Sequence, residues 1–404
     1  MLSKTKLFLV GYFLPAWISA LMMWGDDRTS SSFSAAPYWF VYFKYSIQIL
    51  AILLLFLPIK VRSRPSLLGA FLAIATALSL KFFEPILEAE FIIVNSSIQI
   101  CVIALFLCFA QPSARLEKSD VGFLFSMFLV GFILQIALFL GFGREPSHTL
   151  TDVFVRFNGI TNDSLATGLI IGALAPWAVK SRYAELKVMA IVGMAILSGS
   201  LFAVVFVPAA IIGYLIYNRL YRFAAFILAG IAAIVITFYD LFIEIAQIKV
   251  QSIIVHLRYF LNLGGLDYKQ STKGCSEEFC ESFVELGLHL SPVYLLLFYG
   301  LLLYFLIQFV MRFRPTAGQQ VPYDTLRVFG AAILVASLVH PVPLIPFAIP
   351  IFFVFSSLYR AGAAGSARVG PGRARPGGRR ALSTRRPPPR MRPLGVGPGS
   401  TRWR

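Results

Sequence analysis

The chain has 404 residues, of which 58% are hydrophobic and only 14% are charged. Soluble domains are on average about 45–50% apolar and about 25% charged, so this composition excludes an ordinary soluble protein. The formal net charge is +17, but residues 361–404 supply eleven arginines and no acidic residue. The remaining +6 is ordinary for a membrane protein with basic cytoplasmic loops, so the charge does not argue for nucleic acid as a partner.

Long apolar runs recur along the chain, and a run of about 18 residues can cross a bilayer as a helix. We therefore predict an all-α, polytopic membrane protein with roughly twelve transmembrane helices. Residues 187–217 could form one long helix, but we divide them at Ser198-Gly199-Ser200 because about 20 residues suffice to cross. The predicted spans are 5–24, 39–58, 66–82, 91–110, 121–142, 165–179, 187–198, 200–217, 223–243, 291–311, 327–339 and 342–359.

The basic residues predict the orientation of these spans, because cytoplasmic loops carry an excess of lysine and arginine. With the N-terminus inside, the cytoplasmic loops hold Lys60, Arg62, Arg64, Arg115, Lys118, Lys180, Arg182, Lys187, Arg219, Arg222, Arg312, Arg314 and Arg327. Both termini are then cytoplasmic. Loop 143–164 is external, and so is the long loop 244–290 between the ninth and tenth spans. The run at the N-terminus is a first span rather than a signal peptide, because it lacks a small-residue cleavage site.

The first external loop ends in the polar stretch RFNGITNDSLA, residues 156–166. Gly159 permits a tight turn, and Asn162-Asp163-Ser164 forms an N-cap cluster before the helix that starts at Leu165. These local roles do not explain Arg156, which follows Val155 just outside a span. Its side chain either snorkels at the interface or binds an anion.

The second external loop begins with a predicted amphipathic helix at 249–265, which would lie on the membrane surface. Apolar residues repeat at helical spacing, and Arg258 falls near the boundary between the apolar and polar faces. The helix is either a plain interfacial element or part of a binding site. Further along, Glu281 and His289 lie close to the next span, where each is either an interfacial residue or a catalytic group.

The cysteines divide between the predicted spans and this second loop. Cys275 and Cys280 lie outside, in an oxidising compartment, so we expect a small disulfide there. No histidine stands at zinc spacing, and we expect neither a metal nor a cofactor. Cys101 and Cys108 lie in the fourth span and are expected to be buried apolar residues.

Together the two external loops gather arginines, carboxylates and a histidine on one face of a membrane protein. Arginine binds phosphate and diphosphate in bidentate fashion, which suits a diphosphate carried by a lipid. The chain resembles the O-antigen polymerase / O-antigen ligase superfamily of bacterial surface-polysaccharide enzymes. The resemblance rests on Arg156 to Gly159 with the polar cluster 161–166, the turn in ILSGSLFAV at 196–204, Ser252 to Arg258, and Glu281 to Gly287.

The resemblance implies a membrane-embedded glycosyltransferase whose donor is a glycan on undecaprenyl diphosphate at the periplasmic face of the inner membrane. Arg156 and Arg258 would bind the diphosphate, and Glu281 would be the base, with His289 as its rival. A chain-length regulator and export proteins are the further partners expected, besides membrane lipids. No cofactor, metal or nucleic acid enters this scheme.

Polymerisation of repeat units is the favoured activity, and two alternatives stay open. Ligases of the superfamily place a histidine where this chain has Glu281-Ser282, and a common ligase pattern has a proline that is missing at Asn162-Asp163. A flippase or permease should place ionisable residues inside its spans, and Lys44 is the main exception to otherwise clean spans.

The domain organisation expected is a polymerase-like membrane domain over residues 1–360 and a disordered cytoplasmic tail over 361–404. The tail is rich in Gly, Pro and Arg and cannot form a core. It is either a solvated tail or a basic segment that binds anionic lipid headgroups. The composition changes abruptly at Ala361, which also suggests that the natural reading frame is lost there; resequencing of the source DNA tests this hypothesis.

Overall fold

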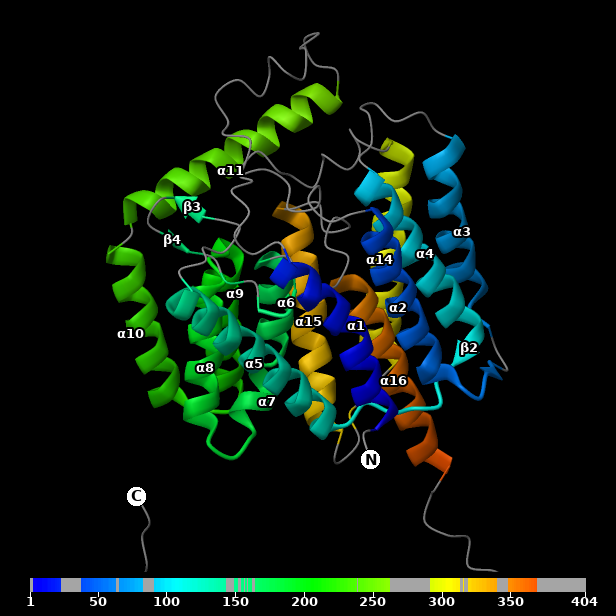
Figure 1. Cartoon of the computed structure of the whole chain (residues 1–404), viewed down its shortest axis with the longest axis horizontal. Coiled ribbons are helices and arrows are strands. Elements are labelled where there is room, and N and C mark those ends of the chain that lie inside the picture. The colour runs from blue at the N-terminus through cyan, green and yellow to red at the C-terminus, as the bar shows by residue number, and fades with distance from the viewer. Residues whose placement is uncertain are drawn as a thin grey trace, which may run out of the picture.

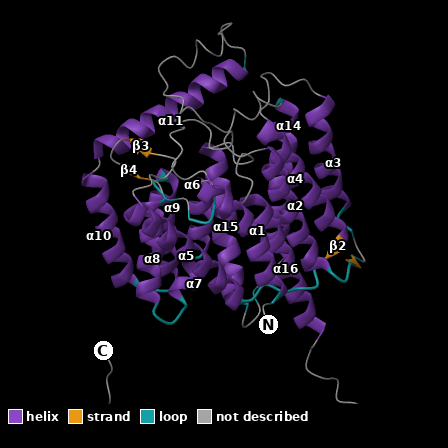
Figure 2. Ribbon diagram, viewed as in Figure 1, coloured by secondary structure: helices purple, strands orange, loops and turns teal. Residues whose placement is uncertain are grey.

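The fold was obtained as a computed structural model, which describes the chain in fourteen stretches. They are residues 3–22, 38–62, 65–82, 91–142, 149–151, 154–155, 157, 159–161, 164–237, 239–261, 291–312, 315, 319–339 and 348–368. Helices make up nearly all of this part of the chain, as Figure 2 shows. The prediction of an all-α protein is therefore confirmed.

The helices follow the order of the predicted apolar runs. They are α1 (Lys4–Met22), α2 (Tyr38–Phe56), α3 (Leu67–Phe82), α4 (Phe91–Phe109), α5 (Lys118–Phe142), α6 (Ser164–Ala173), α7 (Ala175–Val179), α8 (Ala184–Leu197), α9 (Leu201–Tyr217), α10 (Tyr221–Thr237), α11 (Tyr239–Phe260), α14 (Pro292–Arg312), α15 (Gln320–Val339) and α16 (Ala348–Arg368). Two short antiparallel strand pairs accompany them: β1 (Lys60–Val61) with β2 (Ala110–Gln111), and β3 (Thr149–Thr151) with β4 (Phe154–Val155).

The predicted division of residues 187–217 is confirmed. Gly199 has a positive φ of 59° and ends α8, because glycine adopts this left-handed conformation without strain. Ser200 is the N-cap of α9, and its side chain accepts a hydrogen bond from the backbone N–H of Ala203. The serine-rich turn therefore separates two helices that lie against each other.

Several predicted boundaries were wrong. The expected span 165–179 is two helices, with Pro176 in the first turn of α7, where proline is tolerated. The span expected at 223–243 ends at Thr237, and the next helix, α11, starts at Tyr239 rather than at residue 249. Likewise, α15 begins at Gln320 rather than at residue 327. Finally, the span expected at 342–359 is α16, which begins at Ala348 and continues to Arg368; residues 369–404 lie outside the described part of the chain.

The helices form one bundle with an aromatic core (Figure 1). Helices α1 to α4 and α14 pack together on one side, and α6 to α10 on the other, while α15 and α16 contact both groups. Large side chains that are fully buried fill the space between them: Phe8, Tyr12, Phe13, Phe56, Phe128, Phe132, Tyr294, Phe298, Phe309, Phe329 and Tyr359. Aromatic contacts such as Phe13 to Phe128 join α1 to α5.

The two ends of the bundle differ in chemistry. The end at which the N-terminus lies carries basic residues in its turns, and we call it the basic end. Lys4 donates there to the carbonyl of Leu57, and Lys118 donates to the carbonyl of Lys180 at 3.0 Å. Helix α11 lies across the opposite end (Figure 1). The turns in which the sequence concentrates lysine and arginine thus gather at one end.

The outside of the bundle is strongly apolar. Large hydrophobic side chains are exposed on many helices, including Leu50 on α2, Phe71 on α3, Leu140 on α5 and Leu296 on α14. Among the described residues, two stretches are long and apolar enough to cross a membrane, Lys118–Gly141 and Pro292–Phe309. Shorter apolar helices are Phe43–Phe56, Leu67–Leu80, Ser96–Phe109, Ser164–Val179, Phe202–Tyr217, Tyr221–Ala233 and Ala348–Ala361.

Candidate functional site

The described residues between β4 and α6 lie buried in the bundle. Phe157, Gly159, Ile160 and Thr161 are all buried, although none of them belongs to a helix or strand. They belong to the polar stretch at 156–166 in which the first external loop was predicted to end. Backbone groups in such a position must find hydrogen-bond partners inside the protein.

Gln135 of α5 supplies these partners. Its side-chain amide donates to the carbonyl of Gly159 at 2.9 Å, and its carbonyl oxygen accepts from the N–H of Gly159 at 2.9 Å. Gln135 itself is fully buried. Both backbone groups of one turn residue are therefore satisfied by one side chain, which holds the segment against α5. Gln135 was not predicted, because its only sign in the sequence is a single amide in an apolar run.

Two glycines let the segment approach α5 closely. Gly159 has a φ of +60°, and a Cβ placed there would lie 2.7 Å from the ring of Phe132. A Cβ on Gly131 of α5 would lie 2.5 Å from the side chain of Ile160 and 3.2 Å from the backbone of Gly159. Such separations are shorter than ordinary carbon contacts, so both positions require glycine. The tight turn predicted at Gly159 is confirmed.

The segment also contacts the serine-rich turn between α8 and α9. The N–H of Phe157 donates to the carbonyl of Leu197, the last residue of α8, at 2.9 Å. After Gly159, the hydroxyl of Thr161 shares a hydrogen bond with the hydroxyl of Thr167 on α6. The two motifs that the resemblance links, 156–166 and 196–204, are therefore neighbours in space, although helices α6 to α8 separate them in sequence.

Helix α11 holds the one predicted site residue that the structure describes. Arg258 lies in its last turn and is exposed, and it makes no hydrogen bond or ion pair with any other described residue. Exposed apolar residues recur along the helix at positions 250, 254, 257 and 261, which is the spacing of one helical face. This stripe agrees with the predicted amphipathic character, over a helix that starts earlier than expected.

The other predicted site residues lie outside the described part of the chain: Arg156, Glu281, His289 and the cysteine pair Cys275 and Cys280. The expectation for Cys101 and Cys108 is confirmed, because both are buried and free. Within the described ranges no three histidine, cysteine, aspartate or glutamate side chains gather in a way that could hold a metal ion.

Lys44 is buried more deeply than the sequence indicates. It is only 3% exposed, and its ammonium lies 5.1 Å from the centre of the Tyr45 ring. Polar groups of α1, α2, α4 and α14 share this region: Gln48 donates to the carbonyl of Tyr12 at 3.1 Å, and the hydroxyl of Tyr294 donates to Ser97 at 2.7 Å. The bundle interior is therefore less clean of ionisable and polar groups than expected, which weakens the sequence argument against transport.

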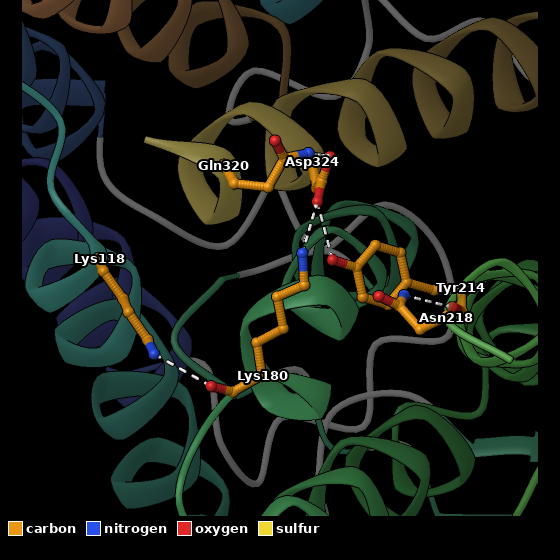
Figure 3. Close-up of polar contacts among 6 residues, drawn as sticks. All are labelled: Lys118, Lys180, Tyr214, Asn218, Gln320 and Asp324. Carbon is orange, nitrogen blue, oxygen red and sulfur yellow. Dashed lines mark hydrogen bonds and ion pairs between the residues drawn. The ribbon is translucent and has the colours of Figure 1, made fainter. Parts of the chain in front are cut away.

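A polar cluster at the basic end was also missed (Figure 3). Asp324 of α15 is 5% exposed and accepts hydrogen bonds from the Tyr214 hydroxyl and the Gln320 amide, both at 2.8 Å. Lys180, after α7, lies 3.3 Å from the same carboxylate. One carboxylate thus connects α15 to α7 and α9. Because every group of the cluster is paired, it stabilises the packing of these helices rather than forming an open binding site.

Comparison with protein families, with characterised proteins and with solved structures finds no match to this chain.

Proposed function

We propose that the chain is a polymerase of lipid-linked oligosaccharide repeat units, embedded in the bacterial inner membrane by roughly twelve helices. The membrane location is supported by large apolar side chains exposed around the bundle, including Phe71, Leu140 and Leu296. Soluble monomers rarely expose apolar patches of such extent. The basic end would face the cytoplasm under the positive-inside rule, which leaves α11 and the buried segment 157–161 on the periplasmic side.

The observation that carries the proposal is the contact between the two motifs of the external site. Gly159 is hydrogen-bonded to Gln135, and Phe157 to Leu197. Backbone held in this way is rigid, and a rigid support is what a binding residue at its edge requires. Arg156 directly precedes Phe157 in the chain, so we expect its guanidinium to be presented from this support.

The proposed reaction extends the glycan on undecaprenyl diphosphate. A hydroxyl oxygen of the acceptor sugar attacks the anomeric carbon of the donor, and a new glycosidic bond forms. The bond between that carbon and the diphosphate oxygen breaks, and the lipid diphosphate leaves. Arg156 and Arg258 would neutralise the charge that develops on the leaving diphosphate. Glu281, or His289 in its place, would take the proton of the attacking hydroxyl.

A transport function is the second candidate, because of Lys44. A buried lysine in a membrane helix is expensive and commonly marks a path for a substrate or ion. A flippase for the same lipid-linked glycan would use such a cation without forming a glycosidic bond. Ligation of a finished glycan, as in the ligase branch of the superfamily, would share the external site and differ in its acceptor.

The proposal is tested in cells whose only copy of the gene carries Arg156→Ala or Arg258→Ala. Loss of polymer while single repeat units accumulate on the periplasmic side of the membrane supports polymerisation and the two arginine roles. Arg222→Ala is the matched control, because Arg222 is exposed in the first turn of α10 at the basic end. Normal polymer from both site variants, at normal protein level, would contradict the proposal. Single units retained on the cytoplasmic side would point to the flippase.

A further inference from the structure

A pair of arginines at the basic end lies outside the proposed reaction site. Arg62 follows β1, and its backbone N–H donates to the carbonyl of Phe109 at the end of α4. Its guanidinium Nε donates to the carbonyl of Ala110 at 2.9 Å, and Nη2 donates to the hydroxyl of Ser357 on α16 at 3.2 Å. The side chain is therefore held in one orientation between the β1–β2 pair and α16.

The described surroundings of Arg62 carry no negative charge. Burial lowers the pKa of its guanidinium, and the other groups that act on it are the Cys108 thiol and the Tyr304 phenol. Arginine has five N–H donors, and only those on Nε and Nη2 have partners among the described residues. The Nη1 group is left without a described protein partner. A fixed guanidinium with donors to spare is preorganised for an anion.

Arg360 adds a second guanidinium to the same place. It lies three residues after Ser357 on α16, a spacing that puts both on one face of the helix. It is partly buried, and its charge acts on the Cys108 thiol together with that of Arg62. The positive charge of Arg360 adds to the attraction of Arg62 for an anion.

The apolar neighbours of the pair indicate an amphiphilic ligand. Ile59 and Val61, on either side of β1's first residue, are 60% and 76% exposed, and Leu57 is also exposed. A free phosphate would gain nothing from these side chains. A phospholipid would place its phosphate against the guanidinium groups and its acyl chains along the exposed apolar residues. Basic pockets at the cytoplasmic ends of membrane helices bind anionic headgroups in this way.

We propose that Arg62 and Arg360 form a binding site for the phosphate of an anionic phospholipid in the leaflet at the basic end. Ser357 orients the Arg62 guanidinium, and the apolar residues before and within β1 contact the acyl chains. The site is independent of the proposed polymerase reaction, because it lies at the end of the bundle opposite α11. It would fix the inner ends of α4 and α16 relative to each other through the bound lipid.

The test measures lipid binding to the purified full-length protein in neutral detergent. Phosphatidylglycerol, phosphatidylcholine and inorganic phosphate are titrated separately, with bound lipid counted by native mass spectrometry and the unfolding temperature followed in parallel. We expect phosphatidylglycerol to bind more tightly than phosphatidylcholine, and its binding to weaken as salt is raised. Arg62→Gln and Arg360→Gln should each weaken it about tenfold, the loss expected for one charge-assisted hydrogen bond.

Arg182→Gln is the matched control, because Arg182 is an exposed arginine at the same end whose described contact is the Tyr183 ring. It should leave the affinity unchanged. Arg62→Lys keeps the charge without the guanidinium fork and provides a second variant if Arg62→Gln does not fold. Equal affinity for the two lipids, or equal loss in Arg182→Gln, would overturn the proposal. Inorganic phosphate that stabilised the protein as much as phosphatidylglycerol would show that the site binds free phosphate. That result would also overturn the proposal of a lipid ligand.

Discussion

Gln135 offers the sharpest test of how the external site is built. Gln135→Leu keeps a side chain of similar size in α5 but removes both hydrogen bonds to Gly159. The N–H and the C=O of Gly159 then stay buried without a partner. Each such group costs about 1–3 kcal/mol, so the free energy of unfolding should fall by about 2–6 kcal/mol. That is a large share of a typical protein's stability.

The assay is thermal or denaturant unfolding of the purified protein in detergent, followed by tryptophan fluorescence. Gln135→Glu is an informative intermediate, because a protonated carboxyl can donate to the Gly159 carbonyl and accept from its N–H, whereas an ionised one is a buried charge facing a carbonyl oxygen. It should lose less stability than Gln135→Leu at low pH, where the carboxyl is protonated, and more stability as the pH is raised. Polymer formation should fall in parallel, since Arg156 adjoins the segment that Gln135 holds.

Gln308→Leu is the control for introducing leucine at a glutamine in an apolar helix. Gln308 is partly buried in α14, and its side-chain oxygen has no hydrogen-bond partner among the described residues. Its replacement removes a buried oxygen that has no described partner, so the free energy of unfolding should not fall. If Gln135→Leu were as mild as this control, the segment 157–161 would not depend on the two hydrogen bonds, and the reasoning would be refuted.

Other substitutions test the turn, the polar cluster and a cap. Gly159→Ala should cost about 2–4 kcal/mol, because a left-handed alanine is strained and its Cβ overlaps an aromatic ring; Gly193→Ala, in open space within α8, should instead stabilise by about 0.5–1 kcal/mol. A double-mutant cycle of Lys180→Met with Asp324→Leu should give a coupling of about 1 kcal/mol, since Lys180 is partly exposed; zero coupling would remove the ion pair from the account. Ser200→Ala should cost about 1 kcal/mol through the lost N-cap, and an unchanged unfolding temperature would contradict that role.

Apolar length was enough to predict the helices but not where several of them end. The turn at Ser198-Gly199-Ser200 was found because small and polar residues interrupt an apolar run, and the turn at Gly159 because glycine precedes a polar cluster. The start of α15 was missed, because Asp324 and Arg327 make the first turns look like a loop. Inside the fold the Asp324 carboxylate meets partners from α7 and α9, which no local pattern reveals.

The site was predictable as a set of segments rather than as a set of contacts. The resemblance linked residues 156–166 with 196–204, and the structure brings the described parts of both together through Phe157 and Leu197. Gln135 could not be chosen from the sequence, because its importance comes from a buried backbone more than twenty residues away. The depth at which Lys44 is buried could not be predicted for a similar reason, because it depends on which helices pack against α2.

The most direct test of the central claim uses the purified full-length protein in liposomes, with single repeat units carried on undecaprenyl diphosphate as the substrate. Electrophoresis of the labelled glycan, together with measurement of released lipid diphosphate, reports bond formation. The account predicts a ladder that grows by one repeat unit at a time, with one lipid diphosphate released for each bond, and loss of the ladder in Arg258→Ala. Movement of the labelled lipid across the bilayer without any new glycosidic bond would contradict it and support transport.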